Sequence, residues 1–370
     1  MPIRIATFNA ENLMHRFDFS GWRNDLRRDR TLHMLDIKDE AHFEALEQAR
    51  VVAHTDDAMQ LTALAIADTF ADVVCLQEVE NMEALKAFEY GYLFKMVGRG
   101  YRHKYLIEGN DRRGIDVAVM MRDETATGEK IEFLSMQSHA QATFADFGIH
   151  NNGLEALGLS ENERIFKRDC LEIDLKVGGK HLSLFVVHFK SMSSGRDGID
   201  GRTWTMPIRE AEANAVRLII ENKFGKDKTE GKRWMVCGDL NDYRSKIVVS
   251  GNRKSGFQFT PVKEDKSGFD PLIADNFSCN LAERLPDLDQ WTLYHSRGPE
   301  ERHLCQLDYL LASPVLADKN PGAVPDILHS GQPWRTPFPD SHLVERYPRT
   351  GWDRPKASDH SPMVVQLNIV

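Results

Sequence analysis

The feature that most constrains the fold of this chain is a recurring pattern: short apolar segments that each end in polar residues. The clearest example is the run WMVCGDLND at residues 234–242, where strand-forming residues are followed by Asp239 and Asn241. Side chains alternate between faces in an extended backbone, so Asp239 and Asn241 are expected to point to the same side. Taken alone, this segment is also compatible with a strand that enters an ordinary turn.

The same pattern occurs at five further places in the chain. Each is a short apolar segment with an amide, carboxylate, imidazole or ammonium group near one end. These segments are residues 1–9 with Asn9, 72–80 with Glu78, 184–191 with His188 and Lys190, 306–313 with Asp308, and 358–365 with Asp359 and His360. Six such coincidences are not expected by chance. We therefore predict that the strand ends converge on one site.

A site that uses residues from Asn9 to His360 needs both ends of the 370-residue chain. We therefore expect one domain over residues 1–370, with long loop insertions near 11–55, 245–304 and 314–357. No apolar run is long enough to span a membrane. The chain starts without the pattern of a signal peptide, and five cysteines without a CxxC pair favour reduced thiols. These features favour a cytoplasmic protein.

Other segments predict the framework around these strand ends. We expect helices at 56–70, 82–90 and 209–222, a strand at 115–121, and a hairpin over 169–187 that turns at Gly178-Gly179. The glycine-rich segment 193–203 is either a substrate-contacting gate or an ordinary surface loop. The arginine-rich segment 22–30 could be a phosphate-contacting arm, but its interleaved acidic residues favour a solvated helix face.

The polar residues at the strand ends indicate a chemistry. Five of them are oxygen donors, which suit magnesium or manganese better than zinc: Asn9, Glu78, Asp239, Asn241 and Asp359. His188 and His360 add imidazoles, and Asp308 is an acidic residue in an apolar strand, where it needs a partner. An aspartate that orients a histidine is a common acid–base arrangement. The set points to attack of water on a phosphate ester.

Seven short motifs support this interpretation when they are taken in order. They are NAENL (9–13), LQEVE (76–80), RGIDVA (113–118), HFKS (188–191), GDLND (238–242), LDYLL (307–311) and SDHSP (358–362). Together they resemble the motifs of the endonuclease/exonuclease/phosphatase superfamily, the DNase I and exonuclease III type, over residues 3–369. The resemblance implies an α+β fold, a four-layer α/β sandwich. In this fold two mixed, mostly antiparallel sheets pack face to face between helices.

The resemblance also implies how a metal ion would be held. Glu78 would be the principal ligand of Mg²⁺ (or Mn²⁺), and Asn9 and Asp359 would lie near it. Asp239 would activate or orient the attacking water, and Asn241 would hold the phosphate.

By the same resemblance, His360 would pair with Asp308 and bind or protonate a phosphoryl oxygen, while His188 would contact the same group. Exonuclease III-type members place a tyrosine where this chain has two arginines, which puts abasic-site repair activity in doubt. We expect the second of these, Arg113, to contact a phosphate. Lys190 is either a further phosphate contact or a residue at the edge of the site.

Three functions follow as hypotheses. The first is a metal-dependent nuclease or phosphodiesterase that acts on nucleic acid. The second is a phosphoesterase for a small molecule or a lipid head group. The third is a catalytically silent binding module, which the intact set of polar residues disfavours. The net charge of −9 argues against a general polyanion-binding surface, so a nucleic acid would be met by local basic patches. We expect no membrane association and no obligate protein partner.

Overall fold

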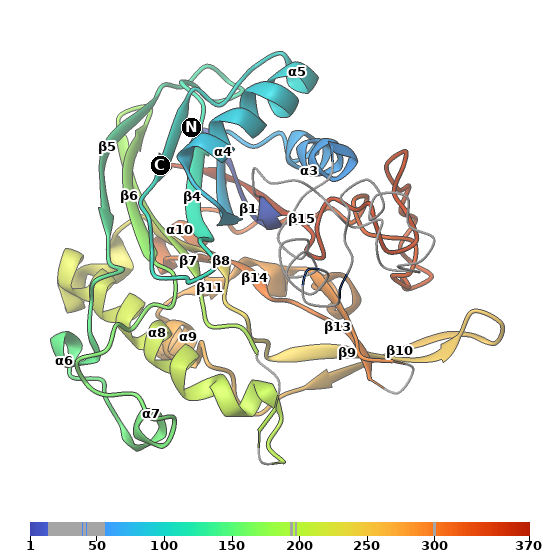
Figure 1. Ribbon diagram of the computed structural model, residues 1–370. Helices are drawn as coiled ribbons and strands as arrows, with labels where there is room; N and C mark the ends of the chain where they lie inside the picture. Colours follow the sequence, from blue (N-terminus) through green and yellow to red (C-terminus); the bar gives the residue numbers. More distant parts are fainter. Residues whose placement is uncertain (14–38, 40–41, 43–55, 193–194, 197, 299–300) are drawn as a thin grey trace.

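Two six-stranded sheets form the centre of the molecule, and helices lie outside them (Figure 1). The computed structural model describes residues 1–13, 39, 42, 56–192, 195–196, 198–298 and 301–370; the arginine-rich segment 22–30 lies outside them. The first sheet has the order β15-β16-β1-β2-β4-β3. Its strands are β1 (Pro2–Leu13), β2 (Val73–Val79), β3 (His103–Leu106), β4 (Asp116–Met121), β15 (Asp326–Ile327) and β16 (Met363–Asn368).

The second sheet has the order β11-β14-β8-β7-β6-β5. Its strands are β5 (Ile131–Ser138), β6 (Cys170–Val177), β7 (Lys180–His188), β8 (Trp234–Asp239), β11 (Cys279–Asn280) and β14 (Asp308–Ala312). The two sheets share one design: each contains a single parallel pair, β1 with β2 and β7 with β8, and its other pairs are antiparallel. Both are therefore mixed and mostly antiparallel, as the sequence predicts.

Alternation along the strands builds the core on both faces of each sheet. In β7, Leu184 and Val186 face the first sheet and pack with Ile5 of β1. Phe185 and Val187 point the other way, into a second cluster beneath the helices. Strands buried on both faces read as continuous apolar runs, which explains why these segments stand out in the sequence.

The helices form the two outer layers. Over the first sheet lie α3 (Asp56–Asp68), α4 (Met82–Phe88), the π-helical turn η2 (Glu89–Leu93) and α5 (Phe94–Val97). Over the second sheet lie α6 (Phe144–Phe147), α7 (Asn152–Ala156), α8 (Gly201–Phe224) and α9 (Asp270–Ile273). The remaining helical segments are α10 (Pro314–Asp318), η3 (Lys226–Gly231), η4 (Ala274–Asn276), η5 (Leu281–Arg284) and η6 (Asp287–Asp289). The four-layer sandwich and the predicted helices near 56–70 and 82–90 are confirmed.

Local signals fix several of these boundaries. The hairpin between β6 and β7 turns at Gly178 and Gly179, whose φ values of 53° and 85° fit a two-residue hairpin turn. Helix α8 begins eight residues before the predicted start at 209, because the Asp200 side chain accepts a hydrogen bond from Thr203 N (3.0 Å). The predicted loop 193–203 therefore ends earlier than expected. Within the described residues, no helix combines the length and apolar character needed to cross a lipid bilayer.

A third sheet occupies the segment 245–304, which we expected to be loops. It has the order β10-β9-β13-β12, formed by β9 (Ser245–Asn252), β10 (Gly256–Lys263), β12 (Leu293–Ser296) and β13 (Arg302–Cys305). Ile247 and Val249 of β9 share one face and pack on Trp291. The expectation of loops was wrong for these four strands, because prolines are not confined to loops. Pro261 belongs to β10 at the sheet edge, where a missing N–H is tolerated.

Candidate active site

The carboxyl ends of the two parallel strand pairs meet at one place. Asn9 and Glu78 come from β1 and β2, while His188 and Asp239 are register partners at the ends of β7 and β8. Asp308, the first residue of β14, pairs with Asp239 in the antiparallel ladder on the other side of β8. Asn9 Nδ2 donates a hydrogen bond to Asp239 Oδ2 (3.0 Å), which joins the two sheets directly.

The backbone presents Glu78 in a strained conformation. Its φ of 63° is in the left-handed region, and the register between β2 and β4 shifts between Leu76 and Val79. Glu78 Oε2 accepts a hydrogen bond from Asn12 N (2.9 Å), and Oε1 lies 3.9 Å from His188 Nε2. Burial raises the pKa of Glu78, and the negative charge of Asp359 raises it further. Two carboxylates thus face each other across the site.

Asp239 is buried and accepts hydrogen bonds on both oxygens. Asn241 N donates to Oδ1 (2.7 Å) and Asn241 Nδ2 to Oδ2 (3.1 Å), and Asn9 Nδ2 shares Oδ2. Burial raises the pKa of Asp239 to about 7; the positive charge of His360 opposes this rise and the negative charge of Asp308 adds to it. A carboxylate with a pKa near neutrality is suited to accept a proton from water.

His360 and Asp308 form the histidine–aspartate pair that the sequence predicts. His360 Nδ1 lies 2.7 Å from Asp308 Oδ2, and both side chains are buried. The position of His360 is set by Ser358, whose Oγ donates to Asn9 O (2.7 Å) and accepts from His360 N (3.0 Å). Burial alone would lower the pKa of His360, but the charges of Asp308 and Asp239 outweigh it and the pKa is raised.

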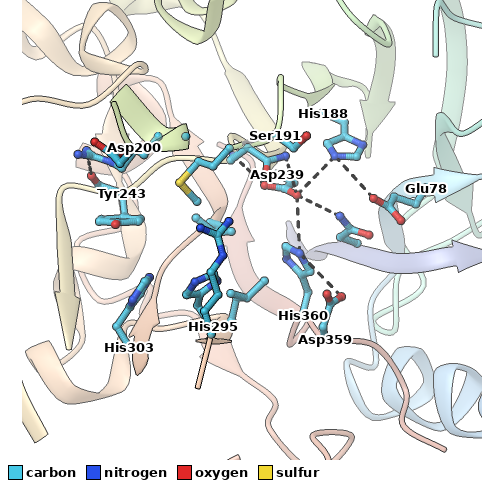
Figure 2. Close-up of a pocket in the computed structure, with 18 of the residues that line it drawn as sticks. Glu78, His188, Ser191, Asp200, Asp239, Tyr243, His295, His303, Asp359 and His360 are labelled. Atoms are coloured by element: carbon cyan, nitrogen blue, oxygen red, sulfur yellow. Dashed lines mark hydrogen bonds and ion pairs between the residues drawn. The ribbon is translucent and has the colours of Figure 1, made fainter. Parts of the chain in front are cut away.

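The second nitrogen of His360 faces the cavity. His360 Nε2 lies 3.8 Å from Asp239 Oδ2 and 4.0 Å from Asp359 Oδ1, both beyond hydrogen-bond range (Figure 2). His188 Nε2 approaches Asp239 Oδ2 at 3.6 Å. Burial and then the charge of Arg168 lower the pKa of His188 well below its usual value, so this imidazole is neutral. The site combines a charged and a neutral imidazole.

Two arginines supply positive charge beside these groups. Arg113 Nε and Nη2 lie 3.1 and 3.2 Å from the two oxygens of Asp111, and Arg168 Nε lies 2.8 Å from Asp111 Oδ2. Arg168 also donates from Nη1 to Phe189 O (2.8 Å), which holds it against the end of β7. Arg168 lines the cavity together with Arg113.

The cavity has a volume of about 300 Å³. Eight of the predicted site residues line it: Asn9, Glu78, Arg113, His188, Asp239, Asn241, Asp359 and His360. Asp308 lies behind His360. Lys190 does not line the cavity, because its ammonium donates to Ser191 O (3.2 Å) and its backbone N to Glu212 Oε2 (2.7 Å). Its predicted substrate contact has no geometric support here.

The donor set fits a hard divalent cation. Asn9, Glu78 and Asp359 present oxygens to the cavity, and the repulsion between the two carboxylates would be relieved by a positive ion. Within the described residues, Asp239, Asp308 and His360 also bring ligand atoms within 4.8 Å of one another. The Nδ1 of His360 is already engaged with Asp308, so that group is better suited to move a proton than to hold an ion.

Comparisons with known proteins bear on the family and the fold of the chain. The family model described as "Endonuclease/Exonuclease/phosphatase family" matches residues 6–360. No curated protein gives a significant match to the sequence. The human Nocturnin catalytic domain with bound sulfate is 13% identical, with 100% of this chain and 95% of that chain covered and a TM-score of 0.51.

Two further solved structures resemble the chain. A Bacteroides thetaiotaomicron protein described as an endonuclease/exonuclease/phosphatase family member is 13% identical, with 99% of this chain and 95% of that chain covered and a TM-score of 0.50. TDP2 from C. elegans is 11% identical, with 99% of this chain and 75% of that chain covered and a TM-score of 0.49. At these identities the likeness concerns the fold.

Proposed function

The chain belongs to the endonuclease/exonuclease/phosphatase family, and from this premise we propose that it is a divalent-metal-dependent phosphodiesterase acting on nucleic acid. The observation that carries the proposal is the meeting of three kinds of group in one cavity. Oxygen donors from β1 and β2 lie beside the buried His360–Asp308 pair, and Arg113 and Arg168 line the same space. Phosphoryl transfer depends mainly on positioning and on neutralisation of oxygen charge, which these groups can provide.

The arginines and His360 are assigned to the phosphate. His360 is held protonated by Asp308, so its Nε2–H can donate to a phosphoryl oxygen. Arg113 and Arg168 are fixed by Asp111 and present positive charge to the same cavity. His188, which is neutral, can donate one hydrogen bond without adding charge.

Asp239 is assigned to the water. Its hydrogen bonds from Asn9 and Asn241 fix the carboxylate, and its raised pKa makes it an effective proton acceptor near neutral pH. Water loses a proton to Asp239 as its oxygen bonds to phosphorus. The bond from phosphorus to the ester oxygen breaks on the opposite side, and the leaving oxygen takes a proton from solvent. Asn9, Glu78 and Asp359 would hold an Mg²⁺ or Mn²⁺ ion, which would supply positive charge to stabilise the phosphate oxygens.

Hydrolysis of a substrate panel tests this function. The panel contains supercoiled plasmid, single-stranded DNA, RNA, bis-p-nitrophenyl phosphate and inositol phosphates, each with Mg²⁺, with Mn²⁺ and with EDTA. We expect metal-dependent cleavage of nucleic acid that is lost in Glu78→Ala and retained in Glu83→Gln, a matched carboxylate change in the first turn of α4.

Each outcome has a distinct meaning. Cleavage of inositol phosphates or the aryl diester without cleavage of nucleic acid would assign the protein to small phosphate esters. Equal activity in EDTA would refute the metal requirement. Failure to hydrolyse any member of the panel would refute the phosphoesterase assignment and favour a silent binding module.

A further inference from the structure

The cavity has a second half that the proposed mechanism does not use. Figure 2 shows Tyr243, His295 and His303 on the side of the cavity away from Glu78 and His188. His295 belongs to β12 and His303 to β13 of the third sheet, and the two residues are direct cross-strand partners. Their rings stack with centroids 4.7 Å apart and planes inclined by 29°. The Tyr243 ring lies 5.6 Å from that of His303. We refer to Tyr243, His295 and His303 as the aromatic shelf.

The rings of the shelf are held in place by neighbouring charged residues, of which Arg202 and Glu301 also line the cavity. The Arg202 guanidinium lies 4.5 Å from the centre of the Tyr243 ring, and its Nη2 donates to Tyr243 O (2.9 Å). Arg202 is itself anchored, because its Nε donates to Asp242 Oδ1 (2.6 Å). His295 Nε2 lies 3.2 Å from a carboxylate oxygen of Glu301. A shelf whose rings are fixed before binding loses little conformational entropy when a flat ligand stacks on it.

The charge around the shelf limits what it can bind. Burial lowers the pKa of His303 to about 3, and the charges of His295, Lys246 and Arg202 act in the same direction. His303 therefore presents a neutral ring. The charges of Arg202 and of Lys246, whose Nζ lies 5.6 Å from the Tyr243 ring, are paired with the carboxylates of Asp242 and Glu264. The neutral ring of His303 and these paired charges favour an uncharged planar ring.

The shelf is joined to the catalytic half through the backbone. Leu293 of β12 forms a bridge with His360, and Ser361 N donates to Thr292 O (2.7 Å). His295 is two residues beyond Leu293 on the same face of the strand, a separation of roughly 7 Å. Both residues line the cavity. A phosphate beside His360 therefore lies close to the shelf.

We propose that the aromatic shelf stacks with the nucleobase adjoining the phosphate that is cleaved. This proposal rests on the proposed phosphodiesterase function and names the part of a nucleic-acid substrate that the cavity recognises. Stacking on aromatic rings accepts every base, because each base has a π face. The shelf therefore selects for the presence of a base rather than for a sequence.

A pair of chromogenic esters tests the proposal. Thymidine 5′-(p-nitrophenyl phosphate) carries a base, whereas methyl p-nitrophenyl phosphate has the same leaving group and no base. The measured quantity is the ratio of kcat/KM for the two esters in Mg²⁺. We expect wild type to favour the thymidine ester, and His303→Ala to lower the ratio about tenfold, the effect of one lost stacking contact. His303→Phe keeps an aromatic ring and should retain most of the preference.

A binding measurement in EDTA separates the shelf from catalysis. Fluorescein-labelled oligothymidylate is compared with an abasic strand of equal length and charge by fluorescence anisotropy. Tighter binding of oligothymidylate, lost in His303→Ala, would support the shelf even if neither ester were hydrolysed and the proposed function failed. Equal binding of the two strands to wild type would overturn it. So would an unchanged ester ratio in both His295→Ala and His303→Ala.

Discussion

We expect Gly238→Ala to disable the site, because the added methyl group would push two neighbouring strands of the second sheet apart. It precedes Asp239 in β8 and pairs with Val187 of the parallel strand β7. A Cβ at Gly238 would lie 1.9 Å from Val187 O, whereas real Cβ contacts stay beyond 3.0 Å, and its φ of 150° is also unfavourable for other residues. The two strands must therefore separate by about 1.1 Å in Gly238→Ala.

This separation acts on the next pair in the ladder, which is His188 with Asp239. The distance from His188 Nε2 to Asp239 Oδ2 is 3.6 Å, so a strand separation of about 1.1 Å would change this distance substantially. Misplacing a catalytic group by 1 Å costs on the order of 10²-fold in rate. Overpacking costs roughly 1–3 kcal/mol of unfolding free energy, and backbone strain costs roughly as much again.

The assay is kcat/KM on bis-p-nitrophenyl phosphate with Mg²⁺, together with urea unfolding followed by circular dichroism. We expect Gly238→Ala to lower kcat/KM about 100-fold and the free energy of unfolding by roughly 2–6 kcal/mol. Gly231→Ala is the matched control, because a Cβ at Gly231 meets no atom within 4 Å. The reasoning is refuted if Gly238→Ala keeps kcat/KM within threefold of wild type and unfolds at the same urea concentration.

Three further changes probe the site and its support. His360→Ala should lower kcat by about 10²–10⁴, the usual range for a positioned acid or base, and a fall of less than tenfold would exclude that role. Arg113→Ala should raise KM and lower kcat/KM, while Arg112→Ala should change them less; equal kinetics in Arg113→Ala and wild type would remove the phosphate contact. Burial raises the pKa of Asp116 to about 6. Between pH 4 and 6, roughly, the folded state therefore keeps a proton that the unfolded state releases. The free energy of unfolding falls as the pH rises through this range. Asp116→Asn should therefore gain in melting temperature relative to wild type over that range and hold the gain above pH 6; a difference independent of pH would contradict this.

Much of the site could be predicted from the sequence because strand ends leave a strong local signal. An apolar run such as the one before Asp239 fixes a buried strand, and alternation fixes which polar residue faces the site. The same reasoning does not place Lys190. Strand alternation would return Lys190 to the face of His188, but β7 ends at His188 and the Lys190 ammonium donates to Ser191 O. Local periodicity cannot show where a strand stops pairing.

Other parts of the site depend on contacts that no local pattern encodes. Arg168 reaches the cavity through Phe189 O, a partner 21 residues away in the chain. The aromatic shelf needs His295 and His303 to pair across two strands in a segment that we expected to be loops. The alternation of Phe257 and Phe259 in β10 did carry a strand signal, which would have revealed this sheet.

The pairing of β1 with β16 has a consequence for how the protein is made. Pro2 pairs with Asn368, and Asn9 O receives its hydrogen bond from Ser358 Oγ, a partner 349 residues later. Contacts so distant in sequence form late, because the intervening chain must be ordered first. During synthesis β1 can complete its pairing only after β16 has left the ribosome. His360 directly precedes β16, so the proposed catalytic centre is complete only after this region has been translated.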